Sequence, residues 1–348
     1  MRSAEVGTAR EFVDDAALEA AIELYEAQAL ALTSRAEHSG DWATTQHRLG
    51  TALSALGQRR RGTRLLEKAI EAFERALSAR SRECEPLDWA AAQNELGQAL
   101  GTLAQRHADA DMLEQAIAAF EAALDVRSKE ATPQDWAITH NNLGAALLTL
   151  GQRRQDKTLL KRAADAYKNA LQVWTRERAP LDWAWTMNNL GTALRALGEL
   201  RKGPRTLEQA VAAYRSALAE RARERMPGDW AMTQNNLGAA LHRLGEREQD
   251  ARHLEASIEA YANALQEWTR EKVPAAWAMT LANQAGACKV LAELTGDVDL
   301  VRTALSRFAA VGEVFRNASH AQYYELVVEQ VARLRKLEHQ LLQRHKDA

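Results

Sequence analysis

Asparagines recur in pairs along this chain, at residues 141–142, 188–189 and 235–236. A side-chain amide is both a donor and an acceptor, so a row of amides can pair with the peptide groups of an extended segment whatever its side chains. Asn94 and Asn283 occupy corresponding places in the same sequence pattern. The same amides could instead form hydrogen bonds between neighbouring helices and fix how the helices stack. The residue types alone leave both interpretations open.

Residues that could carry catalysis or bind a metal show no convergent spacing. The sequence has no glycine-rich phosphate loop and no HExxH, CxxC or GxSxG motif. His47 and His140 lack a second ligand at metal-binding spacing, and Cys84 and Cys288 lie far apart. We therefore expect no enzyme, no cofactor, no metal site and two reduced thiols.

Composition gives no sign of nucleic acid or membrane as a partner. The 348 residues include 45 Lys+Arg and 47 Asp+Glu, so the net charge is -2 and exerts no global attraction on polyanions. The N-terminal sequence MRSAEVGTAREFVDD lacks the apolar core of a signal peptide. No apolar run approaches the ~18 residues that a membrane span needs. We expect a cytoplasmic protein whose arginine-rich connections are solvated loop tips.

Tryptophan marks an internal repeat, because it recurs every 47 residues at 42, 89, 136, 183, 230 and 277. Asp precedes the first five tryptophans, and Ala276 precedes the sixth. With that preceding residue numbered zero, Trp is at +1 and Leu at +15 in all six units, and Leu-Gly is at +8 and +9 in the first five. Strict self-similarity of this length predicts a repeat solenoid.

Each unit contains two segments of helical period, here named helix A and helix B. Helix A should start at the proline two residues before position zero and bury an apolar face that includes the tryptophan. Small residues at +2 and +9 would allow close approach of a neighbouring helix, and glycine at +16 would end helix A at Gly57, Gly151, Gly198 and Gly245. Helix B should then run to about +42.

The repeat predicts an all-α solenoid of antiparallel helix hairpins, with about 14 helices in a single array over 14–346. We expect a disordered segment at 1–13, an N-terminal capping helix B within 14–40 and six repeats over 41–316. A C-terminal capping helix A should span 319–346.

The segment NNLGAALLTLG followed by AxxAYxxAL resembles the tetratricopeptide repeat, which pairs NLGxxYxxLG with AxxxYxxAL. The resemblance covers about residues 14–340, but the period is 47 instead of the usual 34 or so, and the tryptophan lies one helical turn early. The chain is similar to long-period arrays of bacteria and to repeats of the kinesin-light-chain type. This resemblance implies a superhelix whose concave groove binds proteins, with the asparagines at +7 forming a ladder to a peptide backbone.

The candidate site is the face of helix A opposite its apolar stripe. Its expected apolar anchors, at +3, are Ile138, Trp185, Met232 and Met279. Its two amide rows, at +6 and +7, are Asn94, Asn141, Asn188 and Asn235, and Asn142, Asn189, Asn236 and Asn283. Its basic residues, late in the array, are Arg195, His242, Arg243 and Lys289.

These residues predict a scaffold that binds a peptide or helical segment of a partner protein, with apolar anchors and acidic residues, in the C-terminal half of the groove. The alternative is a structural protein that assembles with itself through its end helices or its outer surface. The sequence does not identify the partner.

Overall fold

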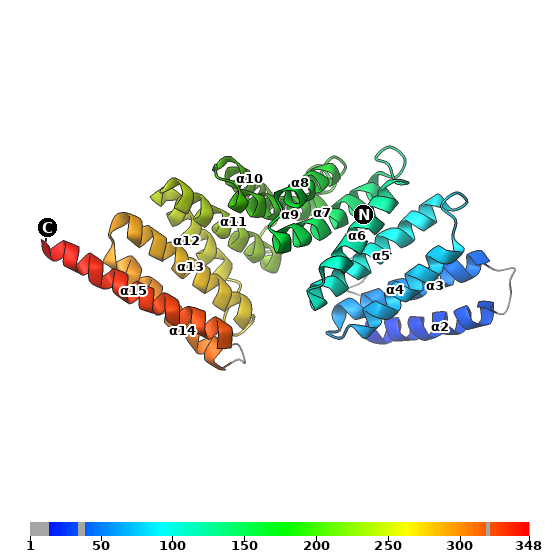
Figure 1. The fold of residues 1–348 in the computed structure, drawn as a ribbon, viewed down its shortest axis with the longest axis horizontal. Coiled ribbons are helices and arrows are strands. Elements are labelled where there is room, and N and C mark those ends of the chain that lie inside the picture. Colours follow the sequence, from blue (N-terminus) through cyan, green and yellow to red (C-terminus); the bar gives the residue numbers. More distant parts are fainter. Residues whose placement is uncertain (1–13, 34–38, 318–320, 348) are drawn as a thin grey trace. The chain divides into compact units, whose positions relative to one another are not determined.

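The computed structural model describes residues 14–33, 39–317 and 321–347. This part of the chain forms fourteen helices and no strand, so the protein is an all-α solenoid, as expected (Figure 1). The helices are α2 (Asp15–Thr33), α3 (Ser39–Arg59), α4 (Arg64–Ala79), α5 (Pro86–His107), α6 (Ala110–Leu124), α7 (Pro133–Arg154), α8 (Lys157–Ala170), α9 (Pro180–Leu200), α10 (Arg205–Leu218), α11 (Pro227–Glu248), α12 (Ala251–Leu265), α13 (Pro274–Thr295), α14 (Val298–Asn317) and α15 (Ala321–Asp347).

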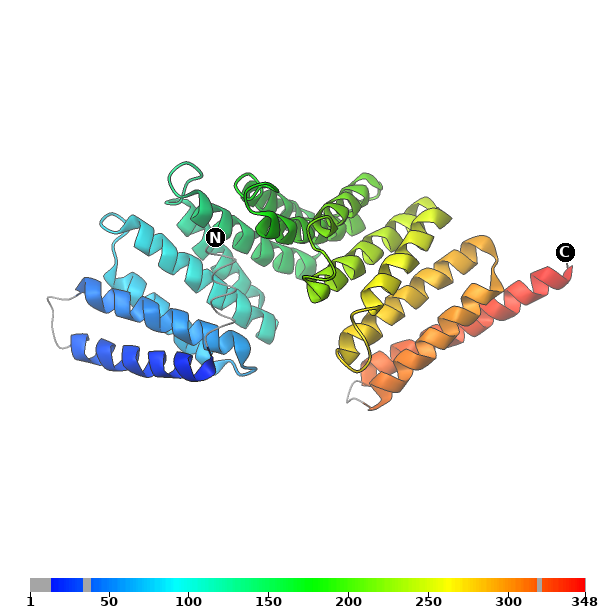
Figure 2. The same cartoon turned by 180° about the vertical axis from the view of Figure 1, so that it is seen from behind.

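The chain divides into two compact units, Met1–Thr186 and Met187–Ala348. The boundary falls within α9, so the first unit holds α2 to α8 and the second holds α10 to α15 (Figure 2). Within each unit, successive helices form the expected hairpins of helix A and helix B, with α2 and α15 as single helices at the two ends. The single array over 14–346 stays a prediction, and the expected disorder at 1–13 lies outside the described residues.

Proline sets the start of helix A, as the sequence predicts. Helices α5, α7, α9, α11 and α13 all begin at a proline. Proline suits this position because its fixed φ is already helical and its missing N–H is not needed there. The repeated aspartate follows in the first turn of most of these helices, for example Asp88 and Asp135, where the helix dipole favours a negative charge.

Glycine at +9 allows helix B to lie close to helix A, which confirms the expectation for small residues. A methyl group on Gly144 would come within 2.8 Å of the Tyr167 ring of α8. The same contact recurs between Gly191 and Tyr214 of the next hairpin. Only a residue without a side chain permits this approach, so the Leu-Gly and Ala-Tyr motifs together fix the hairpin.

Glycine at +16 does not end helix A, and that prediction is wrong. Helix α7 continues past Gly151 to Arg154, and its terminal residue in the left-handed region is Gln155. Gly151 is buried, and a methyl group there would lie 3.0 Å from the side chain of Leu160. The glycine therefore makes room for helix B instead of terminating helix A.

The repeated tryptophans are half-buried, and Trp136 and Trp277 pack against buried apolar clusters, in agreement with their predicted place on the apolar face. An arginine from the preceding helical hairpin lies over the ring in four cases, with 5.2–5.9 Å between the guanidinium carbon and the ring centroid. In the second unit these pairs are Arg223 with Trp230 and Arg270 with Trp277. A cation over a ring face is attracted by the negative electrostatic potential of that face. Each pair therefore joins one repeat to the next.

Candidate peptide-binding surface

A depression of about 310 Å³ lies on the second unit, where helices α9, α11 and α13 are neighbours. Its lining residues are Arg195, Glu199, Asn235, Asn236, Ala239, His242, Arg243, Tyr261, Ala282, Asn283 and Gly286. Six of these belong to the predicted site: Arg195, Asn235, Asn236, His242, Arg243 and Asn283. The repeat brings them together because equivalent positions of successive helices A lie side by side.

Small residues at +10 leave the space above this surface open. Ala239 and Gly286 are the lining residues at that offset on α11 and α13. If Gly286 carried a methyl group, the nearest atom to that group would be His242 Cε1, at 3.4 Å. An extended chain could therefore approach the helix backbones closely at this point.

Several of the asparagines join neighbouring helices. Asn236 Nδ2 donates to Asn188 Oδ1 at 3.2 Å in the second unit, and Asn142 Nδ2 donates to Asn94 Oδ1 at 3.2 Å in the first. The acceptors are buried, with Asn188 only 3% exposed. The interhelix bond that the sequence left open is thus present for these two pairs.

At the C-terminal end of the depression, three amides keep further hydrogen-bonding groups, although two of them also bond to a neighbouring helix. Asn283 on α13 is exposed. Asn235 accepts a hydrogen bond from the Thr280 hydroxyl at 3.1 Å, and Asn236 uses one amide hydrogen in its bond to Asn188. An amide has two donors and an acceptor with two lone pairs, so these three side chains retain groups that a ligand can use.

Carboxylates neutralise the basic residues of the site. Arg195 is paired with Glu199 on the same helix, and Arg243 lies 2.8 Å from Glu246 and 3.8 Å from Glu199. Burial lowers the pKa of His242 and so favours the neutral ring, whereas the nearby Glu246 acts in the opposite direction. Two guanidinium groups and two carboxylates therefore leave the depression without net charge. Lys289, outside the depression, is 3.8 Å from Glu293.

The expected apolar anchors are divided between the two units. Ile138 and Trp185 belong to the first unit, and Met232 and Met279 to the second. Met279 is 55% exposed and Trp185 44% exposed, whereas Ile138 packs beside the first-unit cluster that contains Trp174. Neither methionine lines the depression, but each lies one helical turn before an amide that does, Asn236 or Asn283, so the candidate site of the second unit is the depression with Met232 and Met279 next to it along α11 and α13. Asn94, Asn141, Asn142, Ile138 and Trp185 lie in the first unit.

Three arginines in the last turn of a helix A cap the helix A before it, which corrects the expectation of a solvated loop tip at Arg153. Arg106, Arg153 and Arg247 each donate to a carbonyl near the end of the preceding helix A. Arg153, for example, reaches Ala104 O and Asp109 O, both at 3.2 Å. These carbonyls carry the negative end of the helix dipole, so a cation there is stabilising.

A further row of arginines, at +39, is buried between repeats and was not predicted from the sequence. Arg127 Nη1 donates to Thr139 Oγ1 at 2.7 Å and to Asp135 O at 3.4 Å. Two repeats later, Arg221 Nη1 makes the same two bonds, to Thr233 Oγ1 and Asp229 O. Burial lowers the pKa of both arginines. The signal was the recurrence of Arg at +39 in three units, at Arg80, Arg127 and Arg221, with a threonine at +4 of the next unit after the last two.

No cluster of three or more metal-ligating side chains occurs among the residues that the structure describes. Over the same residues, no helix combines the length and the apolar character of a bilayer span.

Comparison with known proteins points to a repeat family. Residues 42–83 and 230–267 match the family model described as tetratricopeptide repeat. No curated protein matches the sequence. The crystal structure of BtubC (BKLC) from P. vanneervenii is similar over 78% of this chain and 91% of that one, at 19% identity and a TM-score of 0.42. A Rap protein complexed with competence and sporulation factor is similar over 97% and 92%, at 12% identity and a TM-score of 0.42.

Proposed function

We propose that this chain, a tetratricopeptide-like repeat protein, is a protein–protein interaction scaffold that holds a segment of a partner protein in the depression formed by α9, α11 and α13. The observation that supports this proposal most directly is the convergence of three amides, from Asn235, Asn236 and Asn283, around an open depression of about 310 Å³. Small residues beneath that space let a peptide backbone come within hydrogen-bonding reach of the amides.

The chemistry of the surface suits an extended segment with apolar anchors. Met279 is exposed beside the depression, and Met232 is half-buried at the same offset of the preceding repeat. Methionine adapts its shape to different apolar side chains, so two methionines can hold anchors without strict selection. The amides then hold the backbone between those anchors.

An acidic ligand is not part of this proposal. Arg195 and Arg243 are neutralised by Glu199 and Glu246, so the depression offers no net positive charge. We expect binding to depend only weakly on salt, because net electrostatic attraction is what salt screens. An affinity that falls steeply with added salt would restore the acidic preference predicted from the sequence.

Peptide selection tests the proposal. A phage-displayed library of random peptides is selected on the full chain, and the best peptide is titrated calorimetrically. The double variant Met279→Ala plus Asn283→Ala should weaken binding at least ~10-fold, about 1.4 kcal/mol. Both side chains are exposed, so the melting temperature should stay unchanged.

Asn263→Ala on α12 is the matched control, because it removes an amide from a helix B outside the depression. The control should bind the peptide like the wild type. Equal affinity of the double variant and the wild type would place the peptide elsewhere and contradict the proposal.

A further inference from the structure

Helices α2 and α15 are single helices, and neither has its hairpin partner among the described residues. One corresponds to a helix B and the other to a helix A. Leu18 and Tyr25 of α2 have the spacing of Leu160 and Tyr167 in α8, so α2 is a helix B. Tyr324 lies one 47-residue period after Trp277, so α15 is a helix A. The first described helix thus presents the side that helix A normally covers. The last presents the side that helix B normally covers.

The open side of α2 is apolar. The residue before the aromatic of helix B is alanine in the five hairpins from α4 to α12, namely Ala72, Ala119, Ala166, Ala213 and Ala260, and each is at most 6% exposed. In α2 this residue is Leu24, which is 54% exposed. A larger apolar side chain is therefore exposed in α2 at a position that is buried in the five hairpins.

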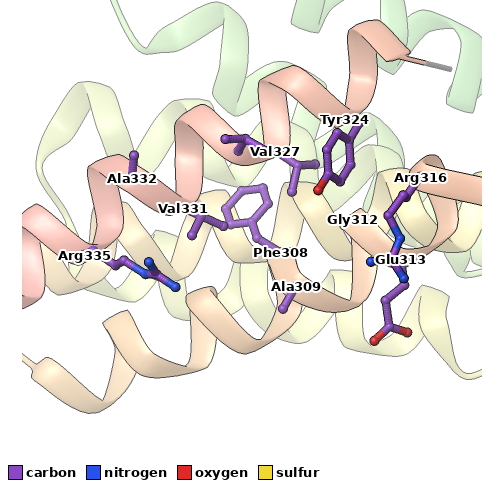
Figure 3. Close-up of a pocket in the computed structure, with 11 residues that line it drawn as sticks. Phe308, Ala309, Gly312, Glu313, Arg316, Tyr324, Val327, Val331, Ala332 and Arg335 are labelled. Atoms are coloured by element: carbon purple, nitrogen blue, oxygen red, sulfur yellow. The ribbon is translucent and has the colours of Figure 1, made fainter.

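The open side of α15 holds a pocket of about 350 Å³ shared with α14 (Figure 3). Phe308, Tyr324, Val327 and Val331 give it an apolar lining, and Val328 at its mouth is 50% exposed. Gly312 also lines the pocket, at a position that is leucine in the five preceding helices B, Leu77, Leu124, Leu171, Leu218 and Leu265. The missing leucine side chain leaves room for one from outside.

We propose that α2 of a second copy of this chain packs over this pocket and inserts Leu24, so that copies associate head to tail. The two departures from the repeat are complementary, since α2 has leucine where alanine is the rule and α14 has glycine where leucine is the rule. A leucine of the second copy then occupies the space that a leucine of the same chain occupies elsewhere.

The surface that α15 offers differs from the earlier helices A at two positions. Glu325 and Ala332 of α15 stand where the earlier helices A have alanine at +2 and, in the first five, glycine at +9. Alanine at +9 already occurs once in the array, at Ala285 of α13, which is buried in the cluster that also contains Phe308 of α14. The seat that α15 offers therefore resembles that of α14 on α13 at +9 and differs from it at +2, where Glu325 is larger than alanine.

Charges favour the same occupant. The described side chains of α2 and the residue before it include five acidic residues and no basic one: Asp14, Asp15, Glu19, Glu23 and Glu26. Asp15, Glu19 and Glu26 already pair with Arg59, Arg60 and Lys68 of the same chain, which leaves Glu23, the exposed neighbour of Leu24, to meet a second copy. The pocket has Arg316 and Arg335 at its two ends (Figure 3). Glu313, the acidic residue of the lining, is 3.1 Å from Arg270 and so is already paired. Glu23 of the second copy can then pair with an arginine at the rim while Leu24 enters the apolar lining.

A head-to-tail contact uses two different surfaces, and this asymmetry provides the test. The mass of the full chain in solution is measured by light scattering after size exclusion and by sedimentation velocity over a wide concentration range. The wild type should associate further as concentration rises. Leu24→Asp and Gly312→Leu should each raise the dissociation constant at least ~10-fold.

Mixing the two variants distinguishes this contact from a symmetric one. The Leu24→Asp variant keeps the pocket and the Gly312→Leu variant keeps α2, so the mixture should form a one-to-one dimer and grow no further. Gly312→Leu should fold, because a methyl group there lies 3.5 Å from Val327 Cγ1, an ordinary contact. Val328→Lys is a second variant of the pocket, and Leu87→Asp, at a leucine 55% exposed on α5, is the control that should associate like the wild type.

Three results would overturn the proposal. The first is a wild type that stays monomeric at every concentration. The second is association that persists in Leu24→Asp or in both pocket variants. The third is a mixture of the two variants that forms no dimer, since only a contact between unlike surfaces can be restored in that way. None of these measurements involves the amide depression, so this inference and the proposed function stand or fall separately.

Discussion

Arg153 shows how one side chain can join two repeats. Its guanidinium donates to carbonyls at the end of α5 and in the connection that follows. Arg153→Ala removes two charge-assisted hydrogen bonds and a favourable charge at a helix C-terminus, so we expect a loss of about 1–2 kcal/mol in the free energy of unfolding. Urea denaturation measures this loss.

The neighbouring Arg154 is the control for that experiment. It forms an ion pair with Glu114 at 2.6 Å, and both side chains are about half exposed, at 44% and 51%. Exposed pairs contribute little, so Arg154→Ala should cost under ~0.5 kcal/mol. Equal costs at the two positions would show that the carbonyl contacts of Arg153 add nothing to stability.

His140 should make stability depend on pH. Burial lowers its pKa from an ordinary value near 6.5 to about 4, so the folded chain keeps the ring neutral while the unfolded chain protonates it. The unfolded state therefore binds more protons between those values, and stability should fall as pH drops from about 6.5 to about 4. Because the ring is partly exposed, we expect a loss of about 1–2 kcal/mol from this residue.

His140→Gln tests this expectation with a residue that three other repeats use at the same offset, Gln46, Gln93 and Gln234. Urea unfolding of the variant should lose less stability between pH 7 and pH 5 than the wild type does. His107→Gln, at an exposed histidine of α5, serves as the control. An unchanged pH dependence in His140→Gln would contradict the assignment.

At the scale of the helical element, two glycines of α5 and α7 should respond in opposite ways to alanine. Gly144→Ala places a methyl group 2.8 Å from the Tyr167 ring and should destabilise by about 1–3 kcal/mol through overpacking. Gly101, inside α5, has open space where a methyl group would stand, with no atom within 4 Å. Gly101→Ala should therefore stabilise by roughly 0.5–1 kcal/mol, since alanine is the better helix former. Thermal melts compare the two, and a stabilised Gly144→Ala would contradict the close packing.

Sequence period predicted the helices well because both helices of each hairpin repeat their apolar faces. It also predicted the start of helix A, since proline has a clear role there. It failed at Gly151, because glycine serves both helix ends and close helix contacts, and a single sequence does not separate the two.

The sequence predicted the amide rows of the candidate site. Whether Asn236 contacts Asn188 or a ligand depends on packing across repeats, which the sequence does not specify. The pairing of Arg195 with Glu199 is within reach of the sequence, since the two residues are four apart on one helix.

At the scale of the whole molecule, helices contact mainly their neighbours along the chain, and helices A also touch the next helix A. Stability in such an array is close to a sum of local terms. Gly144→Ala should therefore increase hydrogen exchange in α7, α8 and the adjoining helices, while α13 to α15 keep their protection. Mass spectrometry of exchanged peptides measures this. A uniform increase along the chain would instead indicate one cooperative unit.

The bonds between repeats have a consequence for how such a chain can change in length. Arg106, Arg153 and Arg247 each reach a carbonyl 49 residues earlier, and Asn142 and Asn236 each reach an asparagine 48 residues earlier. Gain or loss of a whole 47-residue unit leaves each of these arginines a backbone carbonyl at the same offset, and leaves each asparagine its acceptor where the unit before it has Asn at +6, whereas a gap of another size moves the donors out of register. Duplication and deletion in steps of one unit are therefore the length changes that the fold tolerates best, so a lineage of such proteins can lengthen or shorten its binding surface without rebuilding its interior.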